Sequence, residues 1–309
     1  MNFLSIIDGL TKAPCDGALY LIRDLTKQSG FFASDGKLLY IVISINENKS
    51  ENIDTEYLSL KLRVNIHAVQ NNPSFMDGYY DVIELRDSSD THNMESFIKL
   101  CLSHSQNINE LNFRDFFYSL ISLFQLPQDQ LFKNVLGLYG ELKLIEYVWN
   151  EYEKDISNCW HKSGSFSKYD FAFRTFAFEV KTVLSESLIV PIKHGQLFNS
   201  EQTFLCAINC ENSDIGETLS QLIERLIDNF QICNGFNFDL NLEKELKRIS
   251  KIDLTTTRFN FLSINIFKAT DINPFQSIPD EISKLTYNYD LIGKKPLNNK
   301  AVKELLQDV

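Results

Sequence analysis

The stretch YDFAFRTFAFEVKT, Tyr169–Thr182, predicts a tight β-hairpin with two unlike faces. Aromatic residues alternate with smaller or polar ones on both sides of Arg174-Thr175, where the turn would lie. A turn there places Asp170 directly opposite Glu179, because cross-strand partners are equidistant from the turn. Side chains alternate between the faces, so one face is polar and the other apolar. The polar face would hold Asp170, Ala172, Ala177, Glu179 and Lys181, and the apolar face would hold Phe171, Phe173, Phe176, Phe178 and Val180.

The two opposed carboxylates predict a binding site for a cation. Their Cβ atoms would lie roughly 5 Å apart, where like charges destabilise a sheet unless a proton or a cation intervenes. Mg²⁺ favours one or two carboxylates, retained waters and phosphate oxygens. Lys181 would project from the same face and could offset negative charge on a reacting phosphate. The alternative is an edge hairpin with a solvated polar face, on which Arg174 partly neutralises an acid.

A helical pattern over Asn134–Glu153 supplies a third acid. At about 100° per residue, its apolar side chains form one arc, and Glu141 falls inside that arc. Acids are rarely buried unless they are paired or bound to a metal, so Glu141 is a candidate site residue. Gly137 and Gly140 are expected to let this helix approach another backbone closely. In the alternative interpretation, Glu141 lies at the rim of the core and reaches solvent.

In this order and spacing, the three acids and the lysine resemble the signature of the PD-(D/E)xK nuclease superfamily. That signature is a helical glutamate, an aspartate at the start of a hairpin, and (D/E)-x-K in the next strand. The segments GLYGELKLIEYVW, YDFAF, FEVKTV and IPDEISKLTYNYDL also resemble an uncharacterised bacterial family of PD-(D/E)xK proteins, whose genes often lie in defence clusters. The resemblance covers most of Leu131–Leu291 and, more loosely, the N-terminal half. It implies an α+β or α/β fold with a restriction-endonuclease-like core of helix, mixed β-sheet and helix.

The resemblance also implies roles for four residues. Asp170 and Glu179 would bind Mg²⁺ or Mn²⁺, and Glu141 would be a further ligand or would orient a bound water. Lys181 would stabilise the charge of the reacting phosphate. The chain departs from the usual pattern in having Tyr169 rather than proline before the aspartate. The span from Asp170 to Glu179 is also short, although it is compatible with a tight hairpin.

Polar residues after the lysine strand form a second set of candidates. His194, Gln196 and Gln202 could contact a phosphate or the surroundings of the metal, or they could be ordinary loop residues. The other histidines, at positions 67, 92, 104 and 161, form no pair at ligand spacing, although His161 and Lys162 could border the cleft. The sequence contains no GxxxxGK[ST] loop, no GxGxxG after a strand and no GxSxG, so ATP, dinucleotide and serine-hydrolase functions find no support.

We expect a domain boundary near Gln128, where Pro127 ends a helical region. Residues 1–127 would form a β-rich N-terminal domain with helices at its end, for recognition or partner binding. Residues 128–309 would form the nuclease-like domain with a C-terminal extension. The first ninety residues are expected to form strands, within 17–25, 37–45, 56–66 and 78–87, around a polar loop at 46–54; helices should follow at 93–103 and 112–124.

In the second domain, a buried strand at 203–210 and an amphipathic helix within 215–233 are expected to follow the hairpin. A further helix at 241–249, a strand pair and a tail would complete the chain. The amphipathic helix would present one apolar face, made of Leu219, Leu222, Ile223, Leu226, Ile227 and Phe230.

The net charge of −11 argues against a protein wrapped in nucleic acid. The segment Leu131–Ser200 holds eight basic and eight acidic residues, which leaves 22 basic and 33 acidic residues in the rest of the chain. This neutral segment contains the hairpin and permits contact with nucleic acid there. No transmembrane helix, signal peptide or zinc-ligand cysteine spacing is evident, which favours a cytoplasmic protein whose six cysteines are reduced.

Two functions remain open at this point. The first is a Mg²⁺-dependent nuclease, a DNA endonuclease that hydrolyses phosphodiester bonds in bacterial restriction or anti-phage defence, with protein partners in a multi-gene system. The second is a catalytically inactive nuclease-fold protein that acts as a protein- or DNA-binding subunit of a defence complex. The acidic net charge favours the second function, whereas the four matching site residues favour the first.

Overall fold

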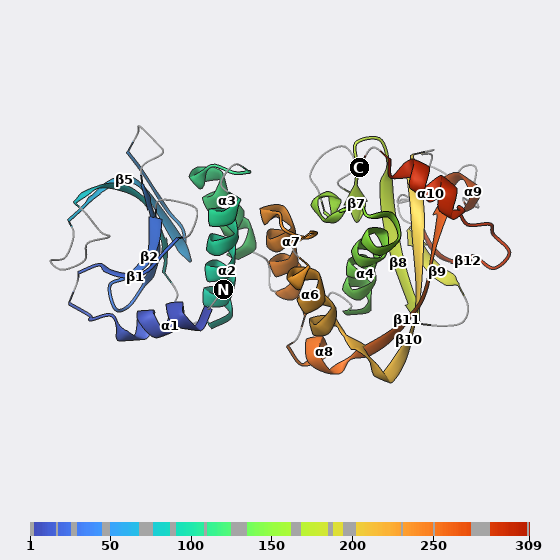
Figure 1. Ribbon diagram of the computed structural model, residues 1–309, viewed down its shortest axis with the longest axis horizontal. Coiled ribbons are helices and arrows are strands. Elements are labelled where there is room, and N and C mark those ends of the chain that lie inside the picture. The colour runs from blue at the N-terminus through green and yellow to red at the C-terminus, as the bar shows by residue number, and fades with distance from the viewer. Residues whose placement is uncertain are drawn as a thin grey trace. The chain divides into compact units, whose positions relative to one another are not determined.

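The computed structural model (Figure 1) describes residues 3–16, 18–25, 30–44, 50–67, 77–86, 91–107, 110–124, 135–161, 168–184, 188–193, 202–229, 231–249, 251–272, 285–307 and 309. The chain forms two compact units, Met1–Pro127 and Gln128–Val309. Each unit contains its own sheet, helices and buried apolar residues. Among the described helices, none is long and apolar enough to cross a membrane.

The first unit is built on a six-stranded antiparallel sheet in the order β1-β2-β3-β6-β5-β4. Strands β2 and β3 are buried along most of their length, because their Phe, Ile, Val and Leu side chains are covered on both faces of the sheet. The elements of this unit are α1 (Phe3–Lys12), β1 (Tyr20–Asp24), β2 (Gly30–Ser34), β3 (Leu39–Ser44), β4 (Glu51–Asp54), β5 (Leu58–Ile66), β6 (Gly78–Leu85), α2 (Thr91–Gln106) and α3 (Phe113–Phe124).

Three elements of the first unit differ from the sequence expectation, and the first is the strand β2, which lies outside the four expected strand ranges. The prediction of a polar loop at 46–54 is wrong for its last four residues, because Glu51–Asp54 forms the edge strand β4 beside β5. Side chains of β4 alternate between half-buried and exposed, so pairing with a neighbouring strand outweighs their low strand propensity. The expectation of strands throughout the first ninety residues is also wrong at the start, where Phe3–Lys12 forms the helix α1.

The second unit contains a four-stranded mixed sheet in the order β11-β10-β8-β7. β8 and β10 run parallel, whereas β7–β8 and β10–β11 are antiparallel pairs, and β9 and β12 form a separate two-stranded sheet. This mixed sheet with its helices agrees with the expected α+β class. The elements are α4 (Val135–Tyr152), the 3₁₀ helix η2 (Ser157–Cys159), β7 (Phe171–Ala172), β8 (Ala177–Leu184), β9 (Ile189–Lys193), β10 (Thr203–Thr218), α6 (Leu219–Asp228), α7 (Phe236–Leu246), α8 (Lys251–Thr256), β11 (Arg258–Lys268), α9 (Ala269–Ile272), β12 (Thr286–Asp290) and α10 (Asn299–Leu305).

Several elements of the second unit differ from expectation in length or pairing. β10 is longer than expected, so the helix expected within 215–233 begins only at Leu219, where Thr218 and Gln221 form a capping box. Ile227, expected on the buried face of that helix, is 49% exposed, and Phe230 lies outside the described residues. The prediction that the two strands near the C-terminus pair with each other is wrong. β11 pairs with β10, and β12 pairs with β9.

The register predicted for the hairpin within Tyr169–Thr182 is confirmed. Phe171 pairs with Phe178 across the strands, and the N–H of Phe173 donates to the carbonyl oxygen of Phe176 over 2.9 Å around the turn. All five side chains of the predicted apolar face are buried in one core cluster with apolar residues of α4. The two acids therefore lie at the end of the hairpin that is away from the turn.

Helix α4 approaches β8 closely at one glycine. A Cβ atom added to Gly140 would lie 1.8 Å from Oγ1 of Thr182, whereas one added to Gly137 would meet nothing within 4 Å. The expected close approach is thus wrong for Gly137, and at Gly140 the nearest neighbour is a side chain rather than a backbone. This contact sets how deeply α4 lies on the sheet, and Glu141 is the next residue of the helix.

Replacing Gly140 with alanine is expected to destabilise the second unit by about 1–3 kcal/mol, because overpacking against Thr182 outweighs the better helix propensity of alanine. The matched change Gly137→Ala should instead stabilise it by up to about 1 kcal/mol. Both tryptophans, Trp149 and Trp160, belong to the second unit, so urea unfolding followed by tryptophan fluorescence measures both effects. Equal changes in the free energy of unfolding for Gly140→Ala and Gly137→Ala would contradict the close contact between Gly140 and Thr182.

Candidate metal centre

Glu141 is a buried acid that a tryptophan holds in place. It is 5% exposed, on the part of α4 that packs into the core. The indole Nε1–H of Trp160 donates a hydrogen bond to Oε2 of Glu141 over 2.7 Å. Trp160 follows the 3₁₀ helix η2 and forms an isolated β-bridge with Phe171 of β7. The burial predicted from the apolar arc of the helix is confirmed, and a rim position that reaches solvent is excluded.

Asp170 lies immediately before β7 and is held by the backbone of β8. Its Oδ2 accepts a hydrogen bond from the N–H of Val180 over 2.7 Å. Burial, and then the charge of Glu141, raise the pKa of Asp170, although this hydrogen bond and the nearby cations oppose the rise. The raised pKa means that the protein compensates the negative charge of Asp170 only in part.

Glu179 on β8 is 1% exposed. Its Oε1 is in very close contact with Nζ of Lys181, and its Oε2 is buried without a hydrogen-bond partner among the described residues. Burial, and then the charge of Asp170, raise the pKa of Glu179 to about 7, although Lys181 opposes the rise. A buried acceptor without a partner calls for a proton, a water or a cation.

His161, which the sequence placed only at a possible border of the cleft, joins Glu141 and Asp170, whereas Lys162 lies outside the described residues. One ligand atom from each of these three side chains lies within 4.8 Å of the other two. The imidazole Nε2 lies 3.1 Å from Oε2 of Glu141 and 3.7 Å from Oε1 of Glu245 on α7. The backbone of His161 is left-handed, with φ of 48°, and its N–H donates to the carbonyl oxygen of Asp170 over 2.8 Å. This turn, which no spacing rule predicts, brings the histidine beside the acids.

The donor set of this cluster fits a divalent metal ion. It offers carboxylate oxygens from α4, from the residue before β7 and from β8, together with an imidazole nitrogen. Glu141, His161 and Asp170 form the group of close ligand atoms, and Glu179 lies outside that group although Asp170 influences its pKa. The summed negative charge of the three acids exceeds the positive charge of Lys181, so a cation would relieve their repulsion. The cation could also bind Oε2 of Glu179, which has no hydrogen-bond partner among the described residues.

The three polar residues expected after the lysine strand are described only in part. His194 and Gln196 lie outside the described residues. Gln202 directly precedes β10, and its carbonyl oxygen accepts a hydrogen bond from the N–H of Ala177 over 2.9 Å. This bond holds the backbone of Gln202 near the turn end of the hairpin, whereas the acids lie at the other end. Contact of these three residues with a phosphate stays a prediction.

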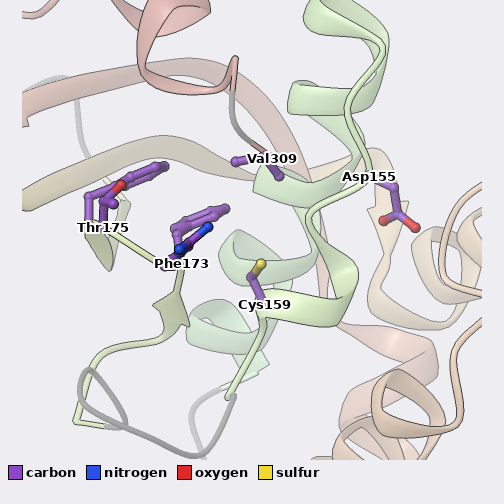
Figure 2. Close-up of a pocket in the computed structure, with 7 residues that line it drawn as sticks. Asp155, Cys159, Phe173, Thr175 and Val309 are labelled. Carbon is purple, nitrogen blue, oxygen red and sulfur yellow. The ribbon is translucent and has the colours of Figure 1, made fainter. Parts of the chain in front are cut away.

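A pocket of about 690 Å³ opens at the turn end of the hairpin (Figure 2). The stacked rings of Phe173 and Phe176, with centroids 4.2 Å apart, line it beside the turn residues Arg174 and Thr175. Its lining contains neither the acids nor the lysine of the cluster, so the pocket is a feature separate from the candidate metal centre. The lining also includes Asp155, Cys159 and Val309.

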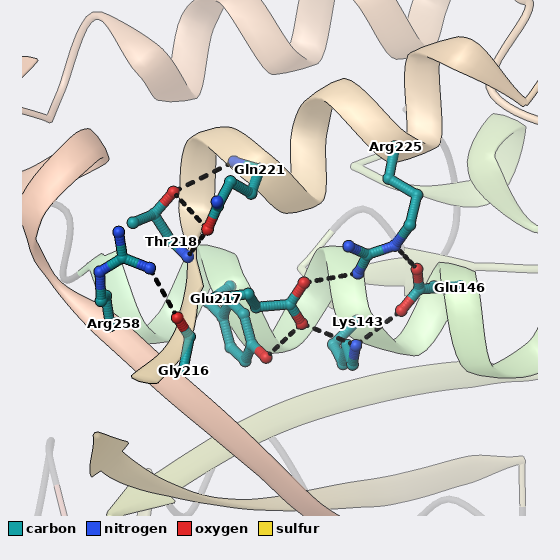
Figure 3. A network of polar contacts seen from close by, with 9 residues as sticks. Lys143, Glu146, Gly216, Glu217, Thr218, Gln221, Arg225 and Arg258 are labelled. Carbon is teal, nitrogen blue, oxygen red and sulfur yellow. Dashed lines mark hydrogen bonds and ion pairs between the residues drawn. The ribbon is translucent and has the colours of Figure 1, made fainter. Parts of the chain in front are cut away.

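A second charged cluster anchors α4 to β10 and α6 (Figure 3). Glu217, near the end of β10, accepts hydrogen bonds from Tyr139 and Lys143, each over 2.8 Å, and from Arg225 over 2.6 Å. Lys143 also donates to Glu146 over 2.7 Å. Burial alone would raise the pKa of Glu217, but the hydrogen bonds from its neighbours outweigh burial and lower the pKa. This network holds the helix that carries the buried acid of the candidate metal centre.

Comparison with known proteins identifies the family of the chain. No curated protein and no solved structure matches it. A family model described as "Putative PD-(D/E)XK family member, (DUF4420)" matches residues 123–292, more than half of the 309 residues. The matched span includes α4, the hairpin and β10, and it confirms the resemblance inferred from the sequence. The chain therefore belongs to the DUF4420 family of PD-(D/E)XK proteins.

Proposed function

We propose that the chain is a divalent-metal-dependent nuclease, and specifically a DNA endonuclease that hydrolyses phosphodiester bonds. The observation that carries this proposal is a group of three acids from separate segments, of which Glu141 and Glu179 are buried and Asp170 is half-buried, with a lysine in contact with Glu179. Membership in the PD-(D/E)XK family supports it, because members of that superfamily are usually nucleases. The proposed core is restriction-endonuclease-like, and the proposed setting is bacterial restriction or anti-phage defence in the cytoplasm.

The same acids would hold the metal ion. Asp170, Glu179 and Glu141 are the proposed ligands for Mg²⁺ or Mn²⁺, and the donor set and the orphaned oxygen of Glu179 support this assignment. When bound, such an ion lowers the pKa of a water molecule and polarises a phosphate oxygen.

Neighbouring groups would prepare the site before substrate binds. The indole of Trp160 fixes the carboxylate of Glu141, and the N–H of Val180 fixes that of Asp170. The side chain of Lys181 is 20% exposed, so its ammonium group can contact a buried acid and still approach a phosphate that enters from solvent. Its positive charge would stabilise the negative charge that builds on the phosphate in the transition state.

We assign the two units different functions. Residues 1–127 would serve recognition or partner binding, and residues 128–309 would carry the nuclease site and a C-terminal extension. Residues 1–127 contain 10 basic and 16 acidic residues, which favours a protein rather than DNA as the partner of the first unit.

A catalytically inactive subunit is the second candidate function. The net charge of −11 favours it, because an acidic surface repels nucleic acid. In this case the chain would keep the nuclease fold and bind a protein or DNA within a defence complex. The buried acids weigh against it, because a site without catalytic use gains nothing from a buried acceptor that has no partner.

Cleavage of supercoiled plasmid tests the proposal directly. Wild-type protein with Mg²⁺ or Mn²⁺ should convert the plasmid to nicked and linear forms, and EDTA should stop the reaction. A parallel preparation of Asp170→Asn, purified identically, controls for a contaminating nuclease. Parallel reactions with RNA test the choice of substrate. Intact DNA and RNA in every metal condition, also with candidate partner proteins added, would reject the nuclease and favour the inactive subunit.

A further inference from the structure

The ring nitrogen of His161 that faces the acids is available to a ligand. Its Nε2 is shielded from solvent and makes no hydrogen bond within the described part of the chain, although Oε2 of Glu141 is 3.1 Å away. A hydrogen bond requires alignment as well as distance, so this neighbour does not satisfy the nitrogen. Neutral imidazole nitrogen is a common metal ligand.

Glu179 has fewer atoms available to a metal ion than its two carboxylate oxygens would suggest. Lys181 contacts its Oε1, which leaves only Oε2 without a partner. Glu141 and Asp170 instead form a group with His161 in which the ligand atoms lie within 4.8 Å of one another. The most compact donor set is therefore two carboxylate oxygens and one imidazole nitrogen, and an ion there would lie beside the free oxygen of a further buried acid.

We propose that His161 binds the metal ion together with Glu141 and Asp170, and that this nitrogen ligand makes the site select Mn²⁺ over Mg²⁺. The inference rests on the metal-dependent function proposed above and adds its ion specificity. Mg²⁺ favours oxygen ligands and retained waters. Imidazole suits first-row transition ions better, and Mn²⁺ also accepts carboxylates, which makes it the appropriate probe.

A salt bridge is the competing role for His161. A protonated imidazole near Glu141 and Glu245 would neutralise acids without binding a metal. Loss of such a charge would change the affinity for Mg²⁺ and Mn²⁺ alike, because both ions carry the same charge. Loss of a nitrogen ligand would weaken Mn²⁺ binding selectively.

The left-handed backbone of His161 decides which variants are informative. At φ of 48°, glycine has no steric penalty, so His161→Gly removes the imidazole without adding strain. His161→Asn is the second variant, because asparagine tolerates this conformation and offers an oxygen in place of the nitrogen. His67→Ala is the matched control, because His67 lies in the first unit with its side chain 77% exposed.

Mn²⁺ binding to the metal-free chain of 309 residues tests the proposal without measuring activity. Electron paramagnetic resonance counts free Mn²⁺ during titration and during competition with Mg²⁺, and spin-echo modulation detects ¹⁴N bonded to the bound ion. Wild type should bind Mn²⁺ at least about tenfold more tightly than Mg²⁺ and show ¹⁴N modulation. His161→Gly should lose the modulation and about 10- to 100-fold in Mn²⁺ affinity, with Mg²⁺ affinity within about threefold of wild type. His67→Ala should match wild type.

The outcomes separate this inference from the proposed nuclease function. Bound Mn²⁺ without ¹⁴N modulation in wild type, or equal losses for both ions in His161→Gly, would overturn the role of His161. If Asp170→Asn nevertheless abolished metal binding and cleavage, the nuclease proposal would stand. Wild type that binds neither ion would overturn both. If His161→Gly does not fold, His161→Asn gives the same comparison, and thermal unfolding in EDTA establishes which variants are folded.

Discussion

Metal-dependent cleavage should fall by about 100- to 1,000-fold when Lys181 is replaced with methionine, while metal affinity stays equal to or above that of wild type. The loss of rate has this size because one group that stabilises charge in the transition state is removed. Affinity should survive because the ammonium group of Lys181 contacts Oε1 of Glu179, an oxygen that an ion could otherwise use. Initial nicking rates on supercoiled plasmid and Mn²⁺ titrations measure the two quantities separately.

The exposed Lys303 on α10 provides the matched control for this prediction. Lys303→Met removes the same charge from the same unit and should leave the nicking rate within about twofold of wild type. If Lys181→Met lost cleavage and metal affinity together, the lysine would have a structural role in the site. Wild-type nicking rates in Lys181→Met would remove the lysine from the proposed catalysis altogether.

The parts of this site that could be predicted from the sequence are those that depend on local periodicity. Alternation of Phe with smaller residues sets the hairpin register, because a shift by one residue would expose the aromatic face. The helical period likewise identifies Glu141 as a charge inside an apolar arc, and it is buried. Both features follow from a repeat of two or of 3.6 residues within a single segment.

The parts that could not be predicted depend on contacts between segments. His161 lies beside the acids because it follows a 3₁₀ turn and itself has a left-handed backbone. Neither feature can be recognised from the sequence spacing of candidate ligands. Glu217 joins Lys143 and Arg225 only because β10 continues well beyond its apolar part, and the sequence indicated a helix there. The pairing of β12 with β9 likewise brings together two strands that no periodicity connects.

Replacing Glu179 with glutamine should stabilise the metal-free chain by about 1–3 kcal/mol at pH 8 and abolish cleavage. The pKa of Glu179 rises from its ordinary value of 4.5 to about 7 in the folded chain, so folding opposes its ionisation. The folded state therefore binds more protons than the unfolded state between these values, and stability falls as the pH rises through this window. Glutamine has no charge to lose, so its advantage should be absent near pH 4.5 and complete above pH 7.

Glu146→Gln is the matched control, with the opposite sign. Burial would raise the pKa of Glu146, but hydrogen bonds from Arg225 and Lys143 outweigh burial and lower the pKa. Its charge therefore stabilises the fold above the ordinary pKa of 4.5, and that stability is lost as the pH falls through the lowered value. Glu146→Gln should be less stable than wild type at pH 8, and the difference should shrink in acid.

Urea unfolding in EDTA at pH 3.5, 4.5, 6, 7 and 8, followed by tryptophan fluorescence, measures both glutamine variants in the second unit. Adding Mn²⁺ at pH 8 should stabilise wild type more than Glu179→Gln, because an ion that binds only the folded state relieves the charge that glutamine lacks. A Glu179→Gln variant that is less stable than wild type at every pH would mean that the contact with Lys181 dominates. Greater stability without metal together with lost cleavage would instead identify Glu179 as an acid kept for function at the expense of folding.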